Sequence, residues 1–545
     1  MKKGTRKIHT GKSPYGVVST ASKYATKAGM AVLENGGNAV DAAAACAICL
    51  GVSEPQASGI GGQSMAILYL KDQDRLFSLD GSSRAPYNIQ PDNLPAKPIK
   101  VGIRSTTVPS TVATVGYMHE NYGKLPLKEV LQPSIDVANN GFRVSALIHN
   151  LLKQEEERLR YDPGVYKNFF VDGKVADAGH IIKQPELAET LQTLADYGWE
   201  EFYTGSIAQR IVEDMEERNG LITLADLAQI PYPLERDVLE TTYRGRRVAT
   251  FPPPGAGRVL IQLLNILERF DSSVLDPEDE IGALIFALAF RFALTDRKKL
   301  PIHPNYYLQS MNQLMIDKGY AKEIAEKIYN IGKFYMGDGF TAPPHSGETT
   351  HLSVIDKDGN AVGITQSIEL VFGSKTIAKG LGFFYNNYMS AYDYKDMTHP
   401  FYLVPGAKPF SSVAPTIIFN GDQVEYLLGS PGSERISTSV VQVISRLIDK
   451  KMPLDQAIAA PRFHSSHYGV LQIEKERFNQ QVIDNLERTG FDIRKRGRYS
   501  FYLGCVQGVK APVNDEDPFY YGAADPRRDG SAGGPEQIKR RENDQ

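Results

Sequence analysis

The chain of 545 residues carries 61 basic and 64 acidic side chains, so its formal charge at pH 7 is only −3. This balance indicates neither a nucleic-acid-binding surface, which needs clustered basic charge, nor an acidic disordered tail. With 42% hydrophobic residues, a chain of this length can bury two cores or one large multilayer core.

The sequence contains no segment that predicts a membrane anchor or an export signal. Its first 18 residues are basic, but no apolar stretch of signal-peptide length follows, and no run of 18 or more apolar residues occurs. We therefore expect a cytoplasmic protein without a membrane partner. Cys46 and Cys49 lie in an Ala-rich apolar segment, and Cys505 is isolated. Because no second pair of metal ligands accompanies them, we expect the cysteines to pack in a core.

The N-terminal part predicts two packed helices followed by a β-hairpin. Apolar residues recur with helical spacing over residues 24–34 and 39–50, a Gly-Gly pair interrupts the pattern, and Asn38 can cap the second helix. Residues 64–81 then change to two short β-rich runs around a polar turn, which is typical of a hairpin.

The remaining chain divides into a helix-rich and a strand-rich part. Helical patterns dominate residues 109–294, and we expect these helices to cover one side of a sheet. From residue 349 onward short strands dominate, including one expected over residues 499–510, with helices over residues 436–449 and 481–490. Parts of such unequal character indicate a layered α+β fold better than alternating βαβ units.

Two adjacent threonines, Thr349 and Thr350, open a predicted hairpin. If Gly359 takes a left-handed conformation in a three-residue loop, Ser367 lies opposite Thr349, whereas a two-residue loop turns Ser367 to the other face. Since β-branched residues are common in strands, the simple alternative is that the threonine pair has only a structural role.

A functional role for Thr349 requires a base, because a threonine hydroxyl is a weak nucleophile at neutral pH. The sequence holds no G-x-S-x-G elbow, no phosphate-binding loop and no H-E-x-x-H motif, and the close pair His464 and His467 lacks companion metal ligands. One remaining base is the threonine's own α-amino group, whose ordinary pKa is about 7.7 to 8. That solution requires the peptide bond before Thr349 to be cut.

Several segments together resemble one enzyme family. They include NGGNAVDAAAACAICLGVSEPQASGIGG, GETTHLSVIDKDGNAVGIT, PGAKPFSSVAPTII, LGSPGSERI and YYGAADPRRDGSA. Over nearly the whole chain, in order, the sequence resembles the γ-glutamyltransferase (γ-glutamyltranspeptidase, glutathione hydrolase) family. The resemblance implies a four-layer αββα sandwich of the N-terminal-nucleophile hydrolase type. It also implies a proenzyme that cleaves itself between Glu348 and Thr349 into subunits of residues 1–348 and 349–545, which together form one αββα unit.

The resemblance also assigns roles to individual residues. Thr349 matches the nucleophile, and Ser367 stands where the family usually has a second threonine that hydrogen-bonds the nucleophile and aids processing. Ser411 and Ser412 match the serine pair that binds the substrate carboxylate. Gly432 and Ser433 match the pair whose backbone N–H groups form the oxyanion hole. A turn before a helix predicted near residue 435 would also direct backbone N–H groups to one point, although an ordinary strand-to-helix turn looks the same in sequence.

The residues that bind the glutamyl head depart from the family pattern. Ser82 stands at the position of the family's usual arginine. Arg84 follows two residues later, and on a strand this offset would place its side chain on the same face as that of Ser82. A surface salt bridge is an equally good explanation for Arg84. On the amine side, Tyr388 and Ala391 replace polar groups, and Glu369 replaces a usual asparagine. We therefore expect an intact nucleophile beside altered recognition of the substrate.

The sequence thus predicts an autoprocessing threonine hydrolase that attacks the amide of a small-molecule substrate, γ-glutamyl or similar, through an acyl-enzyme. The alternative within the class is an acylase or amidohydrolase for a non-glutamyl amide, like cephalosporin acylase or oxamate amidohydrolase relatives. A non-catalytic binding descendant is the alternative from another class. We expect no metal or organic cofactor and no nucleic-acid partner, and the sequence leaves the oligomeric state open.

Overall fold

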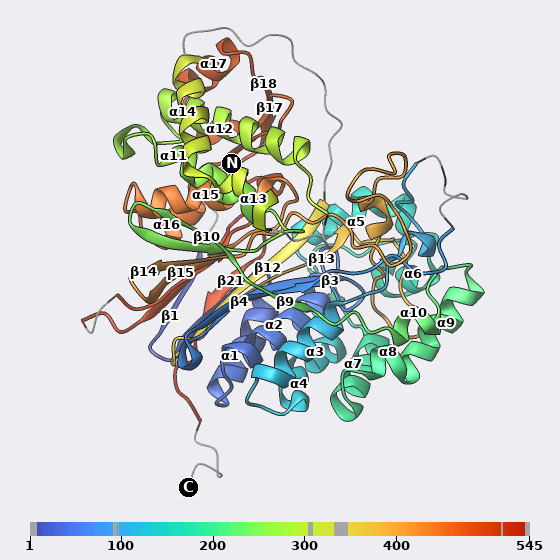
Figure 1. The fold of residues 1–545 in the computed structure, drawn as a ribbon. Helices are drawn as coiled ribbons and strands as arrows, with labels where there is room; N and C mark the ends of the chain where they lie inside the picture. The colour runs from blue at the N-terminus through green and yellow to red at the C-terminus, as the bar shows by residue number, and fades with distance from the viewer. Residues whose placement is uncertain are drawn as a thin grey trace.

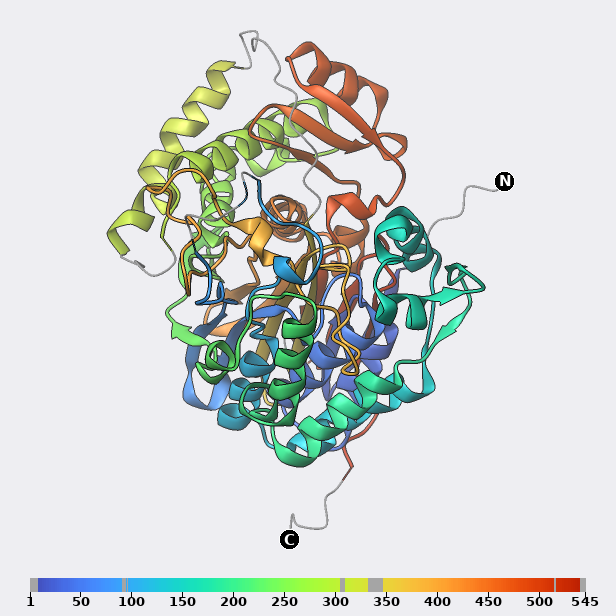
Figure 2. The same ribbon diagram turned by 90° about the vertical axis from the view of Figure 1, so that its right-hand side faces the viewer.

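Two seven-stranded antiparallel sheets stack face to face, and a layer of helices covers the outer face of each (Figure 1). The structure, a computed structural model, describes residues 8–90, 95, 97–303, 309–331, 347–513 and 516–539. Figure 2 shows from the side that the helices within residues 257–299 and 309–331 (light green to yellow-green) lie on the opposite side of the molecule from the helices within residues 23–53 and 111–140 (blue to cyan). The arrangement is the four-layer αββα sandwich expected from the sequence.

Sheet I places the threonine hairpin in its centre. Its strand order is β21 (Ser531–Gly533), β2 (Gly16–Thr20), β12 (Gly347–Asp356), β13 (Ala361–Leu370), β3 (Gln63–Leu70), β4 (Arg75–Gly81) and β9 (Leu234–Arg236). Its outer face is covered chiefly by α1 (Lys23–Glu34), α2 (Ala39–Ser53), α3 (Thr111–Tyr122), α4 (Leu127–Asn140) and α7 (Pro185–Tyr197).

Sheet II lies against the inner face of sheet I. Its order is β1 (His9–Ser13), β20 (Tyr520–Ala524), β19 (Gln507–Lys510), β15 (Gln423–Gly429), β14 (Thr416–Asn420), β11 (Arg246–Thr250) and β10 (Leu239–Tyr243). Its outer layer contains α11 (Gly257–Leu267), α12 (Glu280–Lys299), α13 (Gln309–Ile316), α14 (Lys318–Ile331), α15 (Arg435–Ile448), α16 (Leu454–Ala459) and α17 (Gln480–Arg488).

Smaller elements surround the sandwich. They are α5 (Ala146–Leu159), α6 (Pro163–Phe169), α8 (Glu201–Thr204), α9 (Ser206–Glu217), α10 (Leu224–Ala228), the two-stranded pairs β5 (Phe142–Arg143) with β8 (Ile181–Ile182) and β6 (Phe170–Val171) with β7 (Lys174–Val175), and a sheet of β16 (Phe463–Ser465), β17 (Val470–Glu474) and β18 (Asp492–Arg496). No helix in the described ranges is long and apolar enough to cross a membrane.

Strand alternation distributes the hairpin side chains between two cores. Leu352 and Val354 of β12 pack in the cluster that contains α1 to α4, whereas Ile355 packs with Ile417 and Leu427 between the sheets. Burying such a side chain contributes roughly 1.5 to 3 kcal/mol each. The threonine hairpin is therefore held on both faces.

The predictions for the N-terminal part are confirmed. Asn38 caps α2 in a capping box, accepting hydrogen bonds from the N–H groups of Val40 and Asp41. The cysteines are buried and unpaired, and burial raises the pKa of Cys49 to about 12. These thiols therefore pack as apolar groups.

Two predictions from local pattern were incomplete. Within the helix-rich region 109–294, β10 and β11 form a hairpin that extends sheet II by pairing with β14, a partner far along the chain. In residues 499–510 the strand begins only at Gln507, because a short 3₁₀ turn over Phe501–Leu503 and the left-handed Gly504 (φ +79°) precede it.

The close contact between the sheets predicts a stability defect for Gly429→Ala. A Cβ at Gly429 would lie 2.2 Å from Cε1 of His351, whose ring is hydrogen-bonded to Thr365 Oγ1 at 2.9 Å and Ser353 Oγ at 3.0 Å. The ring must shift, so we expect a loss of about 1 to 3 kcal/mol, seen as a lower midpoint in urea unfolding. Gly497→Ala is the control, because its added Cβ meets nothing within 4 Å. Equal midpoints for the two variants would contradict this view of the sheet contact.

Candidate active site

The hairpin of β12 and β13 has the register of a three-residue loop. Gly359 is left-handed (φ +86°), and the Asp356 N–H donates to the Asn360 carbonyl at 3.1 Å. Pairing continues to Thr350 opposite Gln366. Of the two loop lengths that the sequence left open, the structure has the three-residue loop.

A β-bulge interrupts this pairing at Thr349. The next pair is Glu348 with Glu369, so Ser367 and Ile368 together lie opposite Thr349. The Ile368 N–H donates instead to the carbonyl of Ala57, in the turn after α2, at 3.3 Å. Bulges re-aim side chains and are frequent next to active sites. Here the bulge leaves Thr349 out of the regular ladder.

The Ser367 hydroxyl contacts the peptide that precedes Thr349. Its Oγ donates to the Glu348 carbonyl at 2.5 Å and accepts from the Glu369 N–H at 2.8 Å. Thr349 and Ser367 are 7% and 4% exposed. The hydrogen bond draws electron density toward the carbonyl oxygen, which makes the Glu348 carbonyl carbon more open to a nucleophile.

No side chain in the described ranges accepts a hydrogen bond from the Thr349 hydroxyl. Thr350 lies on the opposite, helix-facing side of β12, as strand alternation requires. His351 is fully buried, and burial lowers its pKa to about 3, so it stays neutral between Thr365 and Ser353. The imidazole therefore has a structural role in the sheet contact.

The Gly432–Ser433 turn lies beside the hairpin. Gly432 (φ +122°) and Ser433 (φ +54°) are both left-handed, and α15 begins two residues later. A Cβ built on Gly347 would lie 3.2 Å from the Ser433 Cβ. Neither backbone N–H of the turn donates to an acceptor in the described part of the chain. A serine in this conformation costs roughly 1 to 2 kcal/mol, so the turn keeps its shape despite strain at Ser433.

Ser411 and Ser412 are both buried beside an arginine that the sequence did not single out. Arg297 of α12 donates from Nη2 to the Ser411 carbonyl at 2.6 Å and from Nη1 to Ser412 Oγ at 3.2 Å. Burial lowers the pKa of Arg297 to about 10, which leaves it charged at neutral pH. The available signal was an arginine ending the apolar run ALIFALAFRFALTDR. The serine pair is thus oriented by a buried cation.

Arg84 is not part of a surface salt bridge among the described residues. Its backbone pairs with Val108, and its half-buried side chain lies near enough to Lys408 for the two positive charges to repel. Ser82, in the slot of the family's arginine, is bound to Asp80 at 2.6 Å, which also pairs with Lys408 at 2.9 Å. Among the described residues, none forms an ion pair with the Arg84 guanidinium.

The groups at the other end of the site gather around Ser367. The Tyr388 side chain is buried and lies near Ser367, Gln63 and Glu369, and burial raises the pKa of its hydroxyl. Burial raises the pKa of Glu369 to about 7, and the charge of Lys100 lowers it. The structure therefore brings Thr349, Ser367, Glu369 and Tyr388 together. Ala391 contributes no polar side-chain atom to this end.

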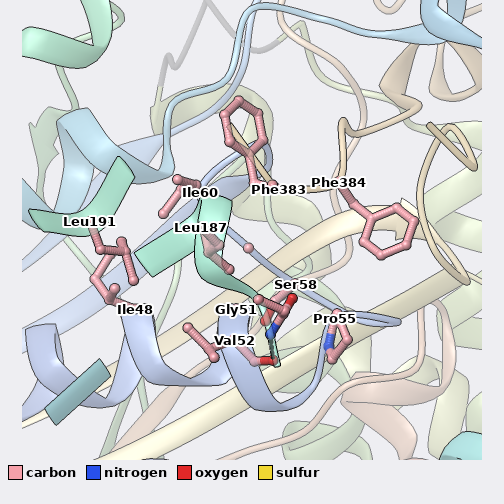
Figure 3. A pocket seen from close by; sticks show the side chains of 13 residues that line it. Ile48, Gly51, Val52, Pro55, Ser58, Ile60, Leu187, Leu191, Phe383 and Phe384 are labelled. Carbon is pink, nitrogen blue, oxygen red and sulfur yellow. Dashed lines mark hydrogen bonds between the residues drawn. The ribbon is translucent and has the colours of Figure 1, made fainter. Parts of the chain in front are cut away.

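An apolar recess between α2 and α7 is separate from these residues (Figure 3). Ile48, Val52, Leu187 and Phe383 are among its lining residues, and its volume of about 10 Å³ holds about one water molecule. None of the candidate site residues lines it. The recess lies where the turn that follows α2 packs against α7.

Comparisons with known proteins agree with this geometry. The family described as gamma-glutamyltranspeptidase matches residues 25–534. The chain is 32% identical over 543 residues to the glutathione hydrolase proenzyme of Escherichia coli, covering 95% of this chain and 92% of that protein. It is also 32% identical over 536 residues to the acylase ACY 1 proenzyme of a Pseudomonas species, covering 95% and 93%.

A solved structure extends the agreement to three dimensions. The cephalosporin acylase of Bacillus halodurans superimposes with a TM-score of 0.86 at 26% identity, over 97% of each chain. The family match includes the residues of β12 and β13, which form the hairpin that carries Thr349. The chain therefore belongs to the γ-glutamyltranspeptidase family of N-terminal-nucleophile hydrolases.

Proposed function

We propose that the chain is a proenzyme that cleaves itself between Glu348 and Thr349, and that the mature enzyme breaks an amide bond of a small molecule with Thr349 as nucleophile. The observation that carries the proposal is the Ser367 hydrogen bond to the carbonyl of residue 348 at 2.5 Å. It activates the peptide bond adjacent to a threonine that is outside the regular strand ladder.

Self-cleavage follows from these atoms. Thr349 Oγ1 adds to the Glu348 carbonyl carbon, the C–N bond breaks, and the proton of the hydroxyl ends on the new α-amino group. Water then hydrolyses the resulting ester, which releases the Glu348 carboxylate and regenerates the hydroxyl. In the mature enzyme, the Thr349 amine is the base, since no described side chain occupies that role.

The same site then processes a substrate. Thr349 Oγ1 attacks the acyl carbon, the N–H groups of Gly432 and Ser433 stabilise the oxyanion, and the leaving amine takes a proton. Water or a second amine accepts the acyl group from Thr349.

The two fragments, residues 1–348 and 349–545, would remain one unit. In sheet I the small-fragment strands β12 and β13 lie between β2 and β3 of the large fragment, with antiparallel pairing on both sides. Separating the fragments would break these ladders and expose both cores. We therefore propose a heterodimer of the two fragments.

The substrate we propose is a γ-glutamyl or similar amide whose carboxylate lies near Arg84, Ser411 and Ser412. Glu369 would contribute a negative charge to the amino group of such a substrate. An acylase acting on a non-glutamyl amide is the second candidate. It is favoured by Tyr388 and Ala391, because they replace the family's polar groups for the ammonium and neither side chain is charged at neutral pH.

The first prediction concerns processing. Wild-type protein on a denaturing gel should give two fragments, and Thr349→Ala should give one full-length band without activity. Ser367→Ala should slow cleavage by about 10²- to 10³-fold, because it removes a donor from the carbonyl that becomes the oxyanion. Unchanged fragments from Thr349→Ala would rule out the proposed nucleophile, and a wild-type protein that stays a single full-length band would favour the non-catalytic descendant.

The second prediction concerns pH. With a pKa of about 7 raised by burial, Glu369 is neutral below that pH and negative above it. For a substrate that bears an amino group, KM should fall about tenfold between pH 6 and pH 8 relative to Glu369→Gln. The Thr349 amine titrates in both proteins, so its effect cancels in the ratio of the wild-type KM to the KM of Glu369→Gln. An amide without an amino group should show no such difference, and equal pH profiles for both substrates would contradict a role for Glu369.

The third prediction separates the two substrate classes. If Tyr388 and Ala391 have removed the ammonium site, as the acylase alternative requires, γ-glutamyl-p-nitroanilide should have a lower kcat/KM than the glutaryl analogue that lacks the amino group. Steady-state kinetics of the purified mature enzyme measures the ratio. A clear preference for the γ-glutamyl compound would favour the glutathione hydrolase assignment over the acylase.

A further inference from the structure

A buried arginine bridges two carboxylates at the residue that precedes the proposed nucleophile. Arg528 donates from Nη2 to Glu348 Oε2 and from Nη1 to Glu54 Oε1, both at 2.8 Å. The three side chains are at most 4% exposed. Glu54 ends α2 and Arg528 precedes β21, so the buried triad joins three segments distant in sequence.

The charges around the triad favour a firmly held Glu348. Burial raises the pKa of Glu348 to about 7, the positive charges of Arg528 and Arg435 lower it, and Glu54 raises it. Among the described residues, the titratable groups near the triad are Arg435 at the start of α15, Lys375 after β13, Cys505 before β19, and Asp529, which follows Arg528 in the chain. An unpaired carboxylate at this depth is costly, so the Glu348 side chain is confined to the guanidinium.

Glu348 is therefore held at two atoms. Its side-chain carboxylate is bound by Arg528, and its backbone carbonyl oxygen is bound by Ser367. Glu54 and Arg528 also border a cavity of about 460 Å³, which extends to the exposed residues Lys23 and Arg143. The cavity gives water, the co-reactant of ester hydrolysis, a route toward the triad.

We propose that Arg528, oriented by Glu54, is a positioning residue for self-cleavage: by holding the Glu348 side chain, it keeps the Glu348 carbonyl against Ser367 and beside Thr349. This inference rests on the proposed cleavage site. Arg528 touches neither the reacting carbon nor Oγ1. It acts only through the side chain of the residue whose carbonyl is attacked.

Cleavage also changes the charge at the triad. Ester hydrolysis gives Glu348 a second carboxylate, so one guanidinium then faces three carboxylates. Repulsion among these buried charges favours departure of the new C-terminus, which prevents the peptide bond from re-forming.

The test follows cleavage of the full-length precursor after a pulse of cell-free synthesis. Glu348→Ala and Arg528→Met should each slow cleavage about 10- to 100-fold, as expected when the reacting carbonyl is displaced. Glu348→Gln, which keeps an oxygen acceptor for Arg528, should be slowed less than Glu348→Ala. The matched control is Arg218→Met, because Arg218 also bridges two carboxylates, Asp162 and Asp214, that contact none of the candidate site residues.

A pH profile distinguishes positioning from a general structural role. Because the pKa of Glu348 is raised to about 7, its carboxylate is lost as pH falls through that value. Cleavage of the wild type should therefore slow about tenfold from pH 8 to pH 6 relative to Glu348→Gln. Folding of each variant is checked by circular dichroism in a Thr349→Ala background, where no chain is cut.

The outcomes separate this inference from the proposed function. If Thr349→Ala is uncut while Glu348→Ala and Arg528→Met cleave at the wild-type rate, only the role of the triad is wrong. Fragments from Thr349→Ala would instead overturn the cleavage chemistry on which the triad depends. If Arg528→Met fails to fold, the cleavage rate of Glu348→Ala and the pH profile of Glu348→Gln still test the role of the triad. In both variants Arg528 stays paired with Glu54, so no buried carboxylate loses its partner.

Discussion

The hydrogen bond from Ser367 to the carbonyl of residue 348 is the interaction on which the site depends. It exists because β13 carries an extra residue at the bulge, which lets the Ile368 N–H turn to the α2 turn while the Ser367 hydroxyl reaches across to β12. In a regular ladder the same carbonyl would accept from a backbone N–H. The Ser367 hydroxyl can polarise the carbonyl of the Glu348–Thr349 peptide without adding a backbone hydrogen bond of the sheet.

The fold surrounds this bond with rigid neighbours on each side. The hairpin lies in the middle of sheet I, its inner face contacts sheet II through His351 and Gly429, and its outer face packs on α2. A strand fixed on both faces can be cut at its end without losing its place. We infer that this placement lets one polypeptide become two while the active site stays assembled.

Much of this arrangement could be predicted from local sequence. The Asn38 cap, the turn at Gly359 and the pairing that follows from it depend on residues close together in the chain. The register of a three-residue loop brings Ser367 opposite Thr349. The bulge that re-aims the Ser367 side chain depends on the Ala57 carbonyl, which accepts from the Ile368 N–H and lies some 300 residues away in the chain. Turn chemistry is local, whereas a bulge is decided by a partner elsewhere.

The missed residues share a different property. Arg297, Glu54 and Arg528 are buried charges whose partners come from distant segments, and a single sequence gives no spacing rule for them. The hairpin of β10 and β11 was missed for a similar reason, since β11 joins sheet II by pairing with β14, a strand far along the chain. Arg84 could be found because it lies two residues after the position of the family's arginine, but only the structure showed that no described residue forms a salt bridge with it.

Intact-mass spectrometry of the purified, active protein tests the central claim most directly. The account predicts two polypeptides that remain associated under native conditions, the smaller one beginning at Thr349. Active protein that consists of a single unbroken chain, or a smaller fragment that begins at any other residue, would contradict it.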